Sequence, residues 1–383
     1  MKKETKVAIS IFAIATAFGF STMGLMPVLS MISDTYRDAG TSTIQLLQTI
    51  PYALIIVGSL IIGYLTTKFT KKKIVIAALL IIGICGVLPF FFSSFAVLLV
   101  SRVLIGLGFG IAGPINTAVI SEFFEPERRA GYMGLHVVGM GAGAIAGNLL
   151  GGFLAEAGLR YFYLVYLLAV ICAAAVLILL PETPAATTKK VSDLKMTKMV
   201  WSLCVISFVF TLFIGAYGIN ISMYISQTLT QDTGAAGLAT AVNAAFATAT
   251  GIVFSKIASK LRKATLPFAV FAAGTGFFVV LFIPGMPGIL IASALCGIAP
   301  SCFNAMSGYL VSVSVEPDAV AKASGIFSIV GSIGGLIAPL VLSGLSNLFG
   351  GNTPGNQFTA AMGGMLIFGI IISIYIGRSQ VEY

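Results

Sequence analysis

Two side chains combine a titratable group with an apolar neighbourhood. Arg102 lies within LLVSRVLIGLGFG, and His136, the sole histidine, lies in a glycine-rich run. A guanidinium inside an apolar run is costly unless it faces water or a partner, so Arg102 is a candidate ligand for a neutral or anionic compound. An imidazole titrates near neutral pH, so His136 is a candidate proton carrier. The alternatives are that Arg102 extends to the membrane interface and that His136 is a hydrogen-bonded packing residue.

Amide and phenol side chains supply the other polar groups of the apolar runs. Tyr217, Asn220, Tyr224 and Gln227 recur at spacings of three and four, which places them on one helix face. Such groups either bind a polar ligand or bond one helix to another, and the sequence leaves both interpretations open. The set that we single out for ligand binding is Arg102, Asn116, Tyr217, Asn220, Tyr224, Asn243 and Asn304.

Acidic side chains are placed away from the middle of the apolar runs. All 13 Asp and Glu residues lie at run ends or in loops. A site for an organic cation usually offers a carboxylate, so a neutral or anionic ligand is expected here. Asp34, near the end of the first run, is a second candidate proton site, although a solvated helix end also explains it.

The sequence contains no pattern of a metal, cofactor or enzyme site. It has no HExxH, GxSxG or GxxxxGK[ST] motif, and its five cysteines form neither a CxxC pair nor a cluster with histidine. We therefore expect no enzyme activity, no metal, no cofactor and no disulfide. The net charge of +9 follows from topology and from anionic lipid, so no nucleic-acid partner is expected.

These residues must be positioned by membrane-spanning helices. Hydrophobic residues make up 58% of the 383 residues and charged residues only 9%, which is too little polar surface for a soluble globule. Twelve apolar runs are long enough to cross a bilayer as helices, and no alternation typical of barrel strands competes. Their expected spans are 7–31, 43–66, 74–93, 96–121, 130–154, 160–180, 200–228, 235–255, 265–283, 288–313, 323–347 and 358–377.

The basic residues predict the orientation of the runs. Most of the 22 Lys and Arg residues fall in loops on one side, which the positive-inside rule assigns to the cytoplasm. Both termini are then cytoplasmic, and we expect a multi-pass protein of a bacterial-type cell membrane that acts as a monomer.

Two internal similarities indicate a duplication. EPERRAGYMG, which starts at Glu125, is echoed 191 positions later by EPDAVAKASG, which starts at Glu316. GYLTTKFTKKK, from Gly63, is echoed by GIVFSKIASKL, from Gly251. We predict two six-helix bundles, 1–180 and 199–383, joined by a cytoplasmic linker, 181–198. Such duplicated halves are a known transporter architecture, with the substrate near the midplane.

Three motifs resemble those of the major facilitator superfamily over essentially the whole chain. The first lies between the second and third runs and matches at Gly63, Leu65, Lys68, Lys71 and Lys72, but Thr67 replaces the usual Asp. The second is the Arg102 and Gly106 pair. The third resembles the helix 5 pattern of drug antiporters, with Gly143, Gly147, Gly151 and Gly152 in place and Asn148 where proline is usual.

The resemblance implies the fold and the function of a transporter. It implies proton-coupled efflux of a small organic compound or drug by alternating access, or else uptake, exchange or facilitated diffusion of a specific metabolite such as an organic anion, sugar or nucleoside. A transporter-like sensor or scaffold is the third alternative, and the short loops argue against it. The glycines imply close helix packing and, in relatives, opposition to leak.

The resemblance also places a gate at the cytoplasmic loops. The expected gate residues are Gly63, Thr67, Lys68, Lys71, Lys72, Gly251, Ser255 and Lys256. Because Thr67 is neutral where relatives carry an Asp, and its counterpart Ser255 is neutral too, we expect a weaker gate and a resting state that opens to the cytoplasm more readily than in relatives.

Overall fold

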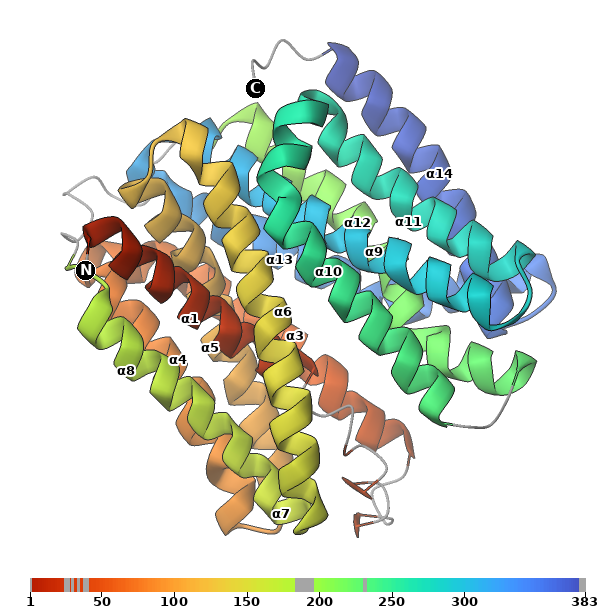
Figure 1. The fold of residues 1–383 in the computed structure, drawn as a ribbon, viewed down its shortest axis with the longest axis horizontal. Helices are drawn as coiled ribbons and strands as arrows, with labels where there is room; N and C mark the ends of the chain where they lie inside the picture. The colour runs from red at the N-terminus through yellow and green to blue at the C-terminus, as the bar shows by residue number, and fades with distance from the viewer. Residues whose placement is uncertain are drawn as a thin grey trace.

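The computed structural model describes residues 2–23, 28, 31–32, 35–36, 41–182, 196–229 and 233–378, and long helices dominate these ranges (Figure 1). In chain order they are α1 (Lys3–Met23), α3 (Thr41–Lys68), α4 (Lys71–Phe91), α5 (Phe95–Phe123), α6 (Pro126–Glu156), α7 (Leu159–Phe162), α8 (Leu167–Leu179), α9 (Lys198–Thr228), α10 (Thr233–Leu261), α11 (Thr265–Phe282), α12 (Gly285–Ser314), α13 (Val320–Ser346) and α14 (Pro354–Arg378). Short 3-10 segments are η3 (Tyr163–Tyr166), η5 (Arg262–Ala264), η6 (Pro317–Ala319) and η7 (Asn347–Phe349).

The helices correspond to the predicted apolar runs. Eleven stretches of the described residues are long and apolar enough to cross a membrane. One of them, Ala235–Phe282, contains both α10 and α11, which the short η5 joins, so each of the twelve predicted runs has its helix. The all-helical membrane fold is therefore confirmed. The first helix begins earlier than predicted, at Lys3, and part of the predicted run, 24–27 and 29–30, lies outside the described residues.

Local sequence explains how these helices begin. Thr70 has extended backbone angles, and its hydroxyl accepts a hydrogen bond from the Lys73 amide at 3.4 Å, which caps α4. Pro126 occupies the first turn of α6, where its missing N–H costs nothing. Thr197 caps α9 by accepting from the Val200 amide. These caps fix the residues at which the helices begin after the loops.

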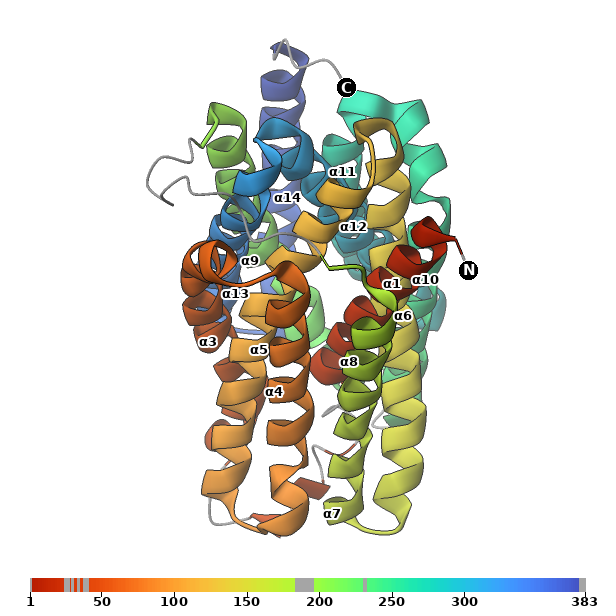
Figure 2. The same cartoon turned by 90° about the vertical axis from the view of Figure 1, so that its left-hand side faces the viewer.

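The helices form two groups along the chain. Helices α1, α3, α4, α5, α6 and α8 pack mainly against one another, and helices α9 to α14 do the same. Figures 1 and 2 show the first group in red to light green and the second in green to blue. The predicted linker boundaries remain a prediction, because residues 183–195 lie outside the described ranges.

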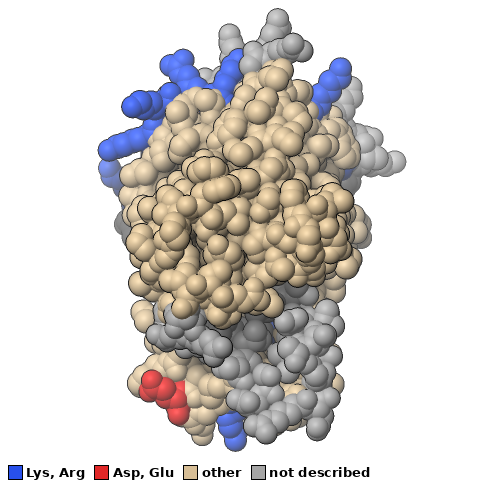
Figure 3. Space-filling view, turned by 90° about the vertical axis from the view of Figure 1, so that its right-hand side faces the viewer, with Lys and Arg blue, Asp and Glu red and all other residues tan. Residues whose placement is uncertain are grey.

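Basic side chains gather at one end of the molecule. We call this the basic end; it carries the turns at 69–70, 124–125 and 262–264. In Figure 3, Lys and Arg cluster at the top of the visible face, which is otherwise mostly uncharged. This distribution is what the positive-inside rule requires of one membrane face.

Contact between the two groups runs through six helices. Helices α3, α5 and α6 of the first group contact α10, α12 and α13 of the second. In Figure 1, α6 and α10 lie side by side near the basic end and diverge toward the opposite end. The two groups therefore meet in a layer at the basic end.

Candidate functional site

Arg129 joins the two groups of helices at the basic end. Its side chain is buried, at 8% exposure. Nε donates to the Phe124 carbonyl at 2.9 Å, Nη2 to the Ser121 carbonyl at 2.8 Å, and Nη1 to the Ser312 carbonyl at 2.6 Å. Ser121 and Phe124 lie at the C-terminal end of α5, and Ser312 lies in the last turn of α12. Carbonyls at helix C-termini carry partial negative charge, so one guanidinium bridges the ends of two helices.

Small residues bring α6 and α10 together beside this bridge. A β-carbon at Gly134 would lie 2.6 Å from the carbonyl oxygen of Gly251, and one at Gly131 would lie 4.0 Å from Cβ of Ser255. On the other flank, a β-carbon at Gly325 of α13 would lie 2.8 Å from the Ser59 carbonyl of α3. The predicted gate residues Gly251 and Ser255 thus stand at the contact between the groups.

The first-half gate residues make local contacts instead. The Thr67 hydroxyl donates to the Tyr64 carbonyl of its own helix at 2.8 Å. Lys71 is buried and paired with Glu122 of α5, while Lys68 is exposed with its ammonium over the Tyr64 ring. Gly63 is buried, Lys72 is half-buried, and Lys256 in the second group is exposed.

The expectation that the basic end opens readily to the cytoplasm stays a prediction. The structure is closed there, although Thr67 carries no charge. Arg129 supplies one charged hydrogen bond across this contact, to the Ser312 carbonyl, whereas the Thr67 hydroxyl bonds within its own helix. Arg129 counted in the sequence only as one of the basic residues of the loops, and the repeat did not single it out, because the aligned position in the second segment is Val320.

His136 contacts Asn116 inside the first group. Nδ1 of His136 lies 2.6 Å from Nδ2 of Asn116, which also lies 3.4 Å from the Ile11 carbonyl of α1. The Phe18 ring stacks on Phe109 with centroids 4.9 Å apart and meets the imidazole edge-on at 6.2 Å. Helices α1, α5 and α6 therefore build one small aromatic and polar cluster around the sole histidine.

Arg102 lies in the core of the first group and does not reach its surface. It is 2% exposed, and Nη1 donates to the Tyr166 hydroxyl of η3 at 2.7 Å. Its Nε and Nη2 have no hydrogen-bond partner among the described residues, and neither has the nearby Tyr163 hydroxyl. The alternative that Arg102 extends to the interface does not fit this burial. Asp34 lies outside the described residues.

The predicted polar face of α9 bonds helices within the second group. Asn220 donates to Oε1 of Gln357 on α14 at 2.8 Å, and the Tyr224 hydroxyl donates to the Val280 carbonyl of α11 at 3.0 Å. The Tyr217 hydroxyl lies 3.5 Å from the Ala239 carbonyl of α10. These contacts correspond to the interpretation in which the polar groups hold helices together.

Two further amides complete this picture. Asn243 of α10 donates to the Ser293 carbonyl of α12 at 3.0 Å. Gln357, which sequence analysis did not single out, donates to Asn352 at 2.7 Å. The amide-rich segment GNTPGNQF before the last apolar run was the available sign of this network.

Asn304 is the exposed member of the predicted ligand-binding set. It stands on α12 one turn before Gly308, where a β-carbon would lie 3.1 Å from Sδ of Met133 on α6. Residues one turn apart share a helix face, so Asn304 lies on the face of α12 that turns toward α6. It stands immediately beyond the layer that closes the basic end.

The glycine motif of α6 packs against its neighbours in the first group. Gly143 meets the Thr16 carbonyl, Gly147 meets Phe20, and Gly151 meets the Phe162 ring, each too closely to admit a β-carbon without a shift. These glycines occupy the close-packed face expected of a small-xxx-small pattern. Gly152 has open space around its missing β-carbon, and Asn148 is exposed.

A family model decides the identity of this fold. The model described as Major Facilitator Superfamily matches residues 11–202 and again residues 203–382. The chain belongs to this superfamily. Members of the superfamily are membrane transporters and not enzymes, so this chain is a membrane transporter.

Relatives in the superfamily come from several bacteria. YnfM, an inner membrane transport protein of Escherichia coli (strain K12), is 28% identical over 148 residues, which cover 38% of this chain and 35% of YnfM. The bacillibactin exporter of Bacillus subtilis (strain 168) is 30% identical over 139 residues, 34% of each chain. The quinolone resistance protein NorA of Staphylococcus aureus (strain N315) is 25% identical over 174 residues, 44% of this chain and 45% of NorA. The matches span a third to less than half of these relatives.

Solved superfamily structures share the architecture. The human organic anion transporter MFSD10 superposes with a TM-score of 0.81 at 15% identity, covering 97% of this chain and all of that one. FucP in the outward conformation superposes with a TM-score of 0.74 at 15% identity and 98% coverage of both chains. At this identity the likeness shows the fold alone.

Proposed function

We propose that this transporter exports a small neutral or anionic organic compound by alternating access, with protons as the coupling ion and a single chain as the working unit. The positive-inside rule assigns the basic end to the cytoplasm, so the contact between the groups lies on the cytoplasmic side in this proposal. The observation that carries alternating access is one-sided closure. Arg129 and the Gly134–Gly251 contact hold the basic end together, whereas Asn304, just beyond them, is exposed.

The proposed substrate class rests on charge. The buried ionic side chains of the described residues are Lys71, Arg102 and Arg129, and all are basic. Lys71 is paired with Glu122 and Arg129 with carbonyls, which leaves Arg102 with tyrosine partners only. Such surroundings favour neutral or anionic compounds over cations. The description of a relative as the bacillibactin exporter supports the direction of transport.

The proposed proton site is His136. A neutral imidazole nitrogen accepts the Asn116 amide proton, but a protonated imidazole donates from both nitrogens. Protonation therefore forces the Asn116 amide to turn its Oδ1 toward the ring, and this oxygen has no partner among the described residues. Because Asn116 lies on α5 and His136 on α6, the proton would alter the contact between two helices that reach the closed layer.

A second candidate function is uptake, exchange or facilitated diffusion of a specific metabolite without a proton. It is favoured by the lack of any fully buried Asp or Glu among the described residues, where His136 is the remaining candidate for coupling. The relative FucP is a fucose:proton symporter, so the fold itself does not fix direction.

Purified protein in proteoliposomes separates the two functions. With an imposed pH gradient, export predicts that a labelled organic anion accumulates against its own gradient and that an uncoupler abolishes the accumulation. The matched variant His136→Gln should equilibrate substrate without accumulating it. Equilibration by the wild-type protein that ignores the pH gradient would overturn the proton-coupled proposal and leave facilitated diffusion.

A further inference from the structure

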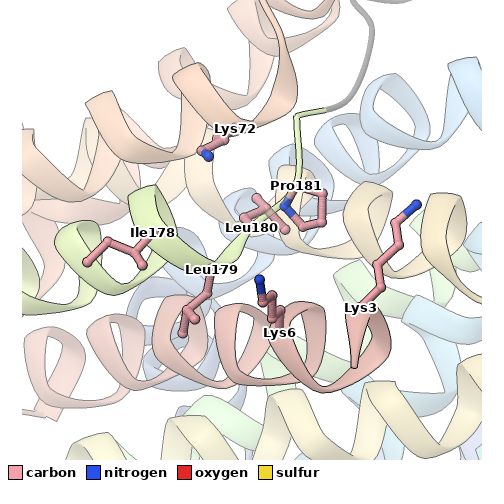
Figure 4. Close-up of a pocket in the computed structure, with 7 residues that line it drawn as sticks. All are labelled: Lys3, Lys6, Lys72, Ile178, Leu179, Leu180 and Pro181. Carbon is pink, nitrogen blue, oxygen red and sulfur yellow. The ribbon is translucent and has the colours of Figure 1, made fainter. Parts of the chain in front are cut away.

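A hollow of about 380 Å³ opens at the basic end of the first group, away from the contact between the groups. Lys3 and Lys6 of α1, Lys72 of α4 and the end of α8 with the two residues that follow it, 178–181, line the hollow (Figure 4). In Figure 4, Lys6 and Lys72 extend toward Leu179–Pro181 from opposite sides, while Lys3 extends away. The lining contains three ammonium groups and no carboxylate.

Two acids that stand near these lysines are already paired elsewhere, and a third, Glu182, is exposed and directly follows Pro181 of the lining. Glu4 forms an ion pair with Arg128 at 2.8 Å, and Glu122 is paired with Lys71. In the part of the chain that the structure describes, Lys6 and Lys72 form no ion pair, and both are half-buried. Two neighbouring cations that lack a counter-charge repel each other, so an anion between them would be stabilised.

Helix geometry adds to the positive potential. Lys72 lies in the first turn of α4 and Lys6 lies close to the start of α1. Helix N-termini carry partial positive charge and normally favour acidic side chains, not lysines. The N-termini of both helices therefore add partial positive charge to that of the lysine ammonium groups at the hollow.

The remaining wall is apolar and reaches the bilayer. Ile178 is 76% exposed on the outside of α8, and Leu180 beside it is 1% exposed. A ligand that fills this hollow therefore meets cations on one side and a lipid-facing apolar surface on the other. A phospholipid with a net negative headgroup has this combination, since its phosphate accepts hydrogen bonds from lysine and its acyl chain lies along apolar side chains.

We infer that the hollow is a binding site for an anionic phospholipid of the leaflet at the basic end, with Lys6 and Lys72 holding its phosphate. The site is separate from the contact between the groups and does not depend on the direction of transport or on its coupling.

Lipid retention tests the site. The protein is purified in a zwitterionic detergent with mixed phosphatidylglycerol and phosphatidylcholine, and bound lipid is counted by native mass spectrometry. We expect selective retention of phosphatidylglycerol and a fall in its affinity of about fivefold for each lysine removed, in Lys6→Gln and in Lys72→Gln. The matched control is Lys256→Gln with Lys260→Gln, which removes two exposed lysines of the second group.

Three outcomes decide the inference. Selective loss in the Lys6 and Lys72 variants supports it, whereas equal loss in the control pair shows unspecific attraction to charge and overturns it. Displacement of phosphatidylglycerol by millimolar inorganic phosphate or glycerol 3-phosphate would identify a free-phosphate site and also overturn it. Gel filtration and circular dichroism establish that each variant is folded before lipid is counted.

Discussion

At the scale of residues, Arg129 supplies a charged hydrogen bond across the closed basic end. Two of the Arg129 hydrogen bonds, to Ser121 and Phe124, stay within the first group, and only the bond to Ser312 joins the two groups. Opening the basic end therefore breaks one charged hydrogen bond and exposes one carbonyl. A hydrogen bond to a charged group contributes about 1.5–3 kcal/mol, which is enough to decide which of two closely balanced states is populated.

Arg129→Lys should shift the population toward the state open at the basic end. An ammonium lacks the planar fork that reaches three carbonyls at once, so the bond to Ser312 is lost or weakened. The shift should be about 10-fold or more, the equivalent of about 1.5 kcal/mol. It is measured as a slower reaction of a cysteine at Asn304 with a membrane-impermeant maleimide added outside. Arg128→Lys, whose exposed partner is Glu4, is the control and should leave the rate unchanged; equal rates in both variants would remove Arg129 from the gate.

Two asparagines with different surroundings should give different phenotypes. Asn304→Ala removes an exposed group on the face toward α6, so we expect a raised KM of transport with unchanged thermal stability. Asn220→Ala leaves the buried Gln357 with one partner fewer, which should destabilise the second group by about 1–3 kcal/mol. Transport kinetics and thermal unfolding in detergent measure the two effects. The assignment of Asn304 fails if its variant loses stability and keeps its KM.

The sequence predicted which residues are chemically unusual better than it predicted their partners. Arg102 was recognised because a cation in an apolar run is costly, but its partner Tyr166 lies 64 positions away and carries no charge pattern. The spacing of the polar residues on α9 could not predict whether their face turns toward the other group of helices or packs within its own group. The pairing of Asn220 with Gln357, 137 positions later, decides this and depends on the packing of two distant helices.

At the scale of elements, the contact between α6 and α10 depends on the absence of side chains. Gly134 and Gly251 let the two backbones approach, since a β-carbon on Gly134 would meet the Gly251 carbonyl at 2.6 Å. Helix boundaries were predictable because apolar length and polar turns are local properties. The sequence could not predict which glycines face the other group of helices, because Gly134 and Gly143 stand on the same helix and meet different neighbours.

Gly134→Ala should therefore separate α6 from α10 and favour opening at the basic end. The added methyl group forces a shift of a backbone atom, which no side-chain rotation can relieve. The same maleimide reaction at Asn304→Cys reports the change. Gly152→Ala, on the same helix with open space around the new atom, should leave the rate unchanged, and Gly143→Ala should lower stability without altering the rate. A result in which Gly143→Ala and Gly134→Ala behave alike would show that the glycines act only on folding.

At the scale of the whole molecule, the duplicated sequence predicted the architecture but not its state. Apolar runs, lysine-rich loops and the repeat of EPERRAGYMG by EPDAVAKASG are sufficient to predict helices and two related halves. Which end of the molecule is open depends on small differences between the contacts that close one end and those that close the other. The Arg129 bond to the Ser312 carbonyl joins the two groups beside the neutral Thr67, and it depends on two helices that are distant in the sequence.

Alternating access requires that the two halves separate at the basic end during each cycle. Gly131 and Ser255 offer a direct test, because a β-carbon at Gly131 would lie 4.0 Å from Cβ of Ser255, within the range that a disulfide spans. The double variant Gly131→Cys with Ser255→Cys should form a cross-link on oxidation. Transport should then stop, and a reductant should restore it. Each single variant serves as the control for oxidation of the native cysteines, of which Cys85 is half-buried and the other four are buried. Full transport by completely cross-linked protein would contradict a mechanism in which the basic ends part, because a disulfide would hold α6 and α10 together throughout.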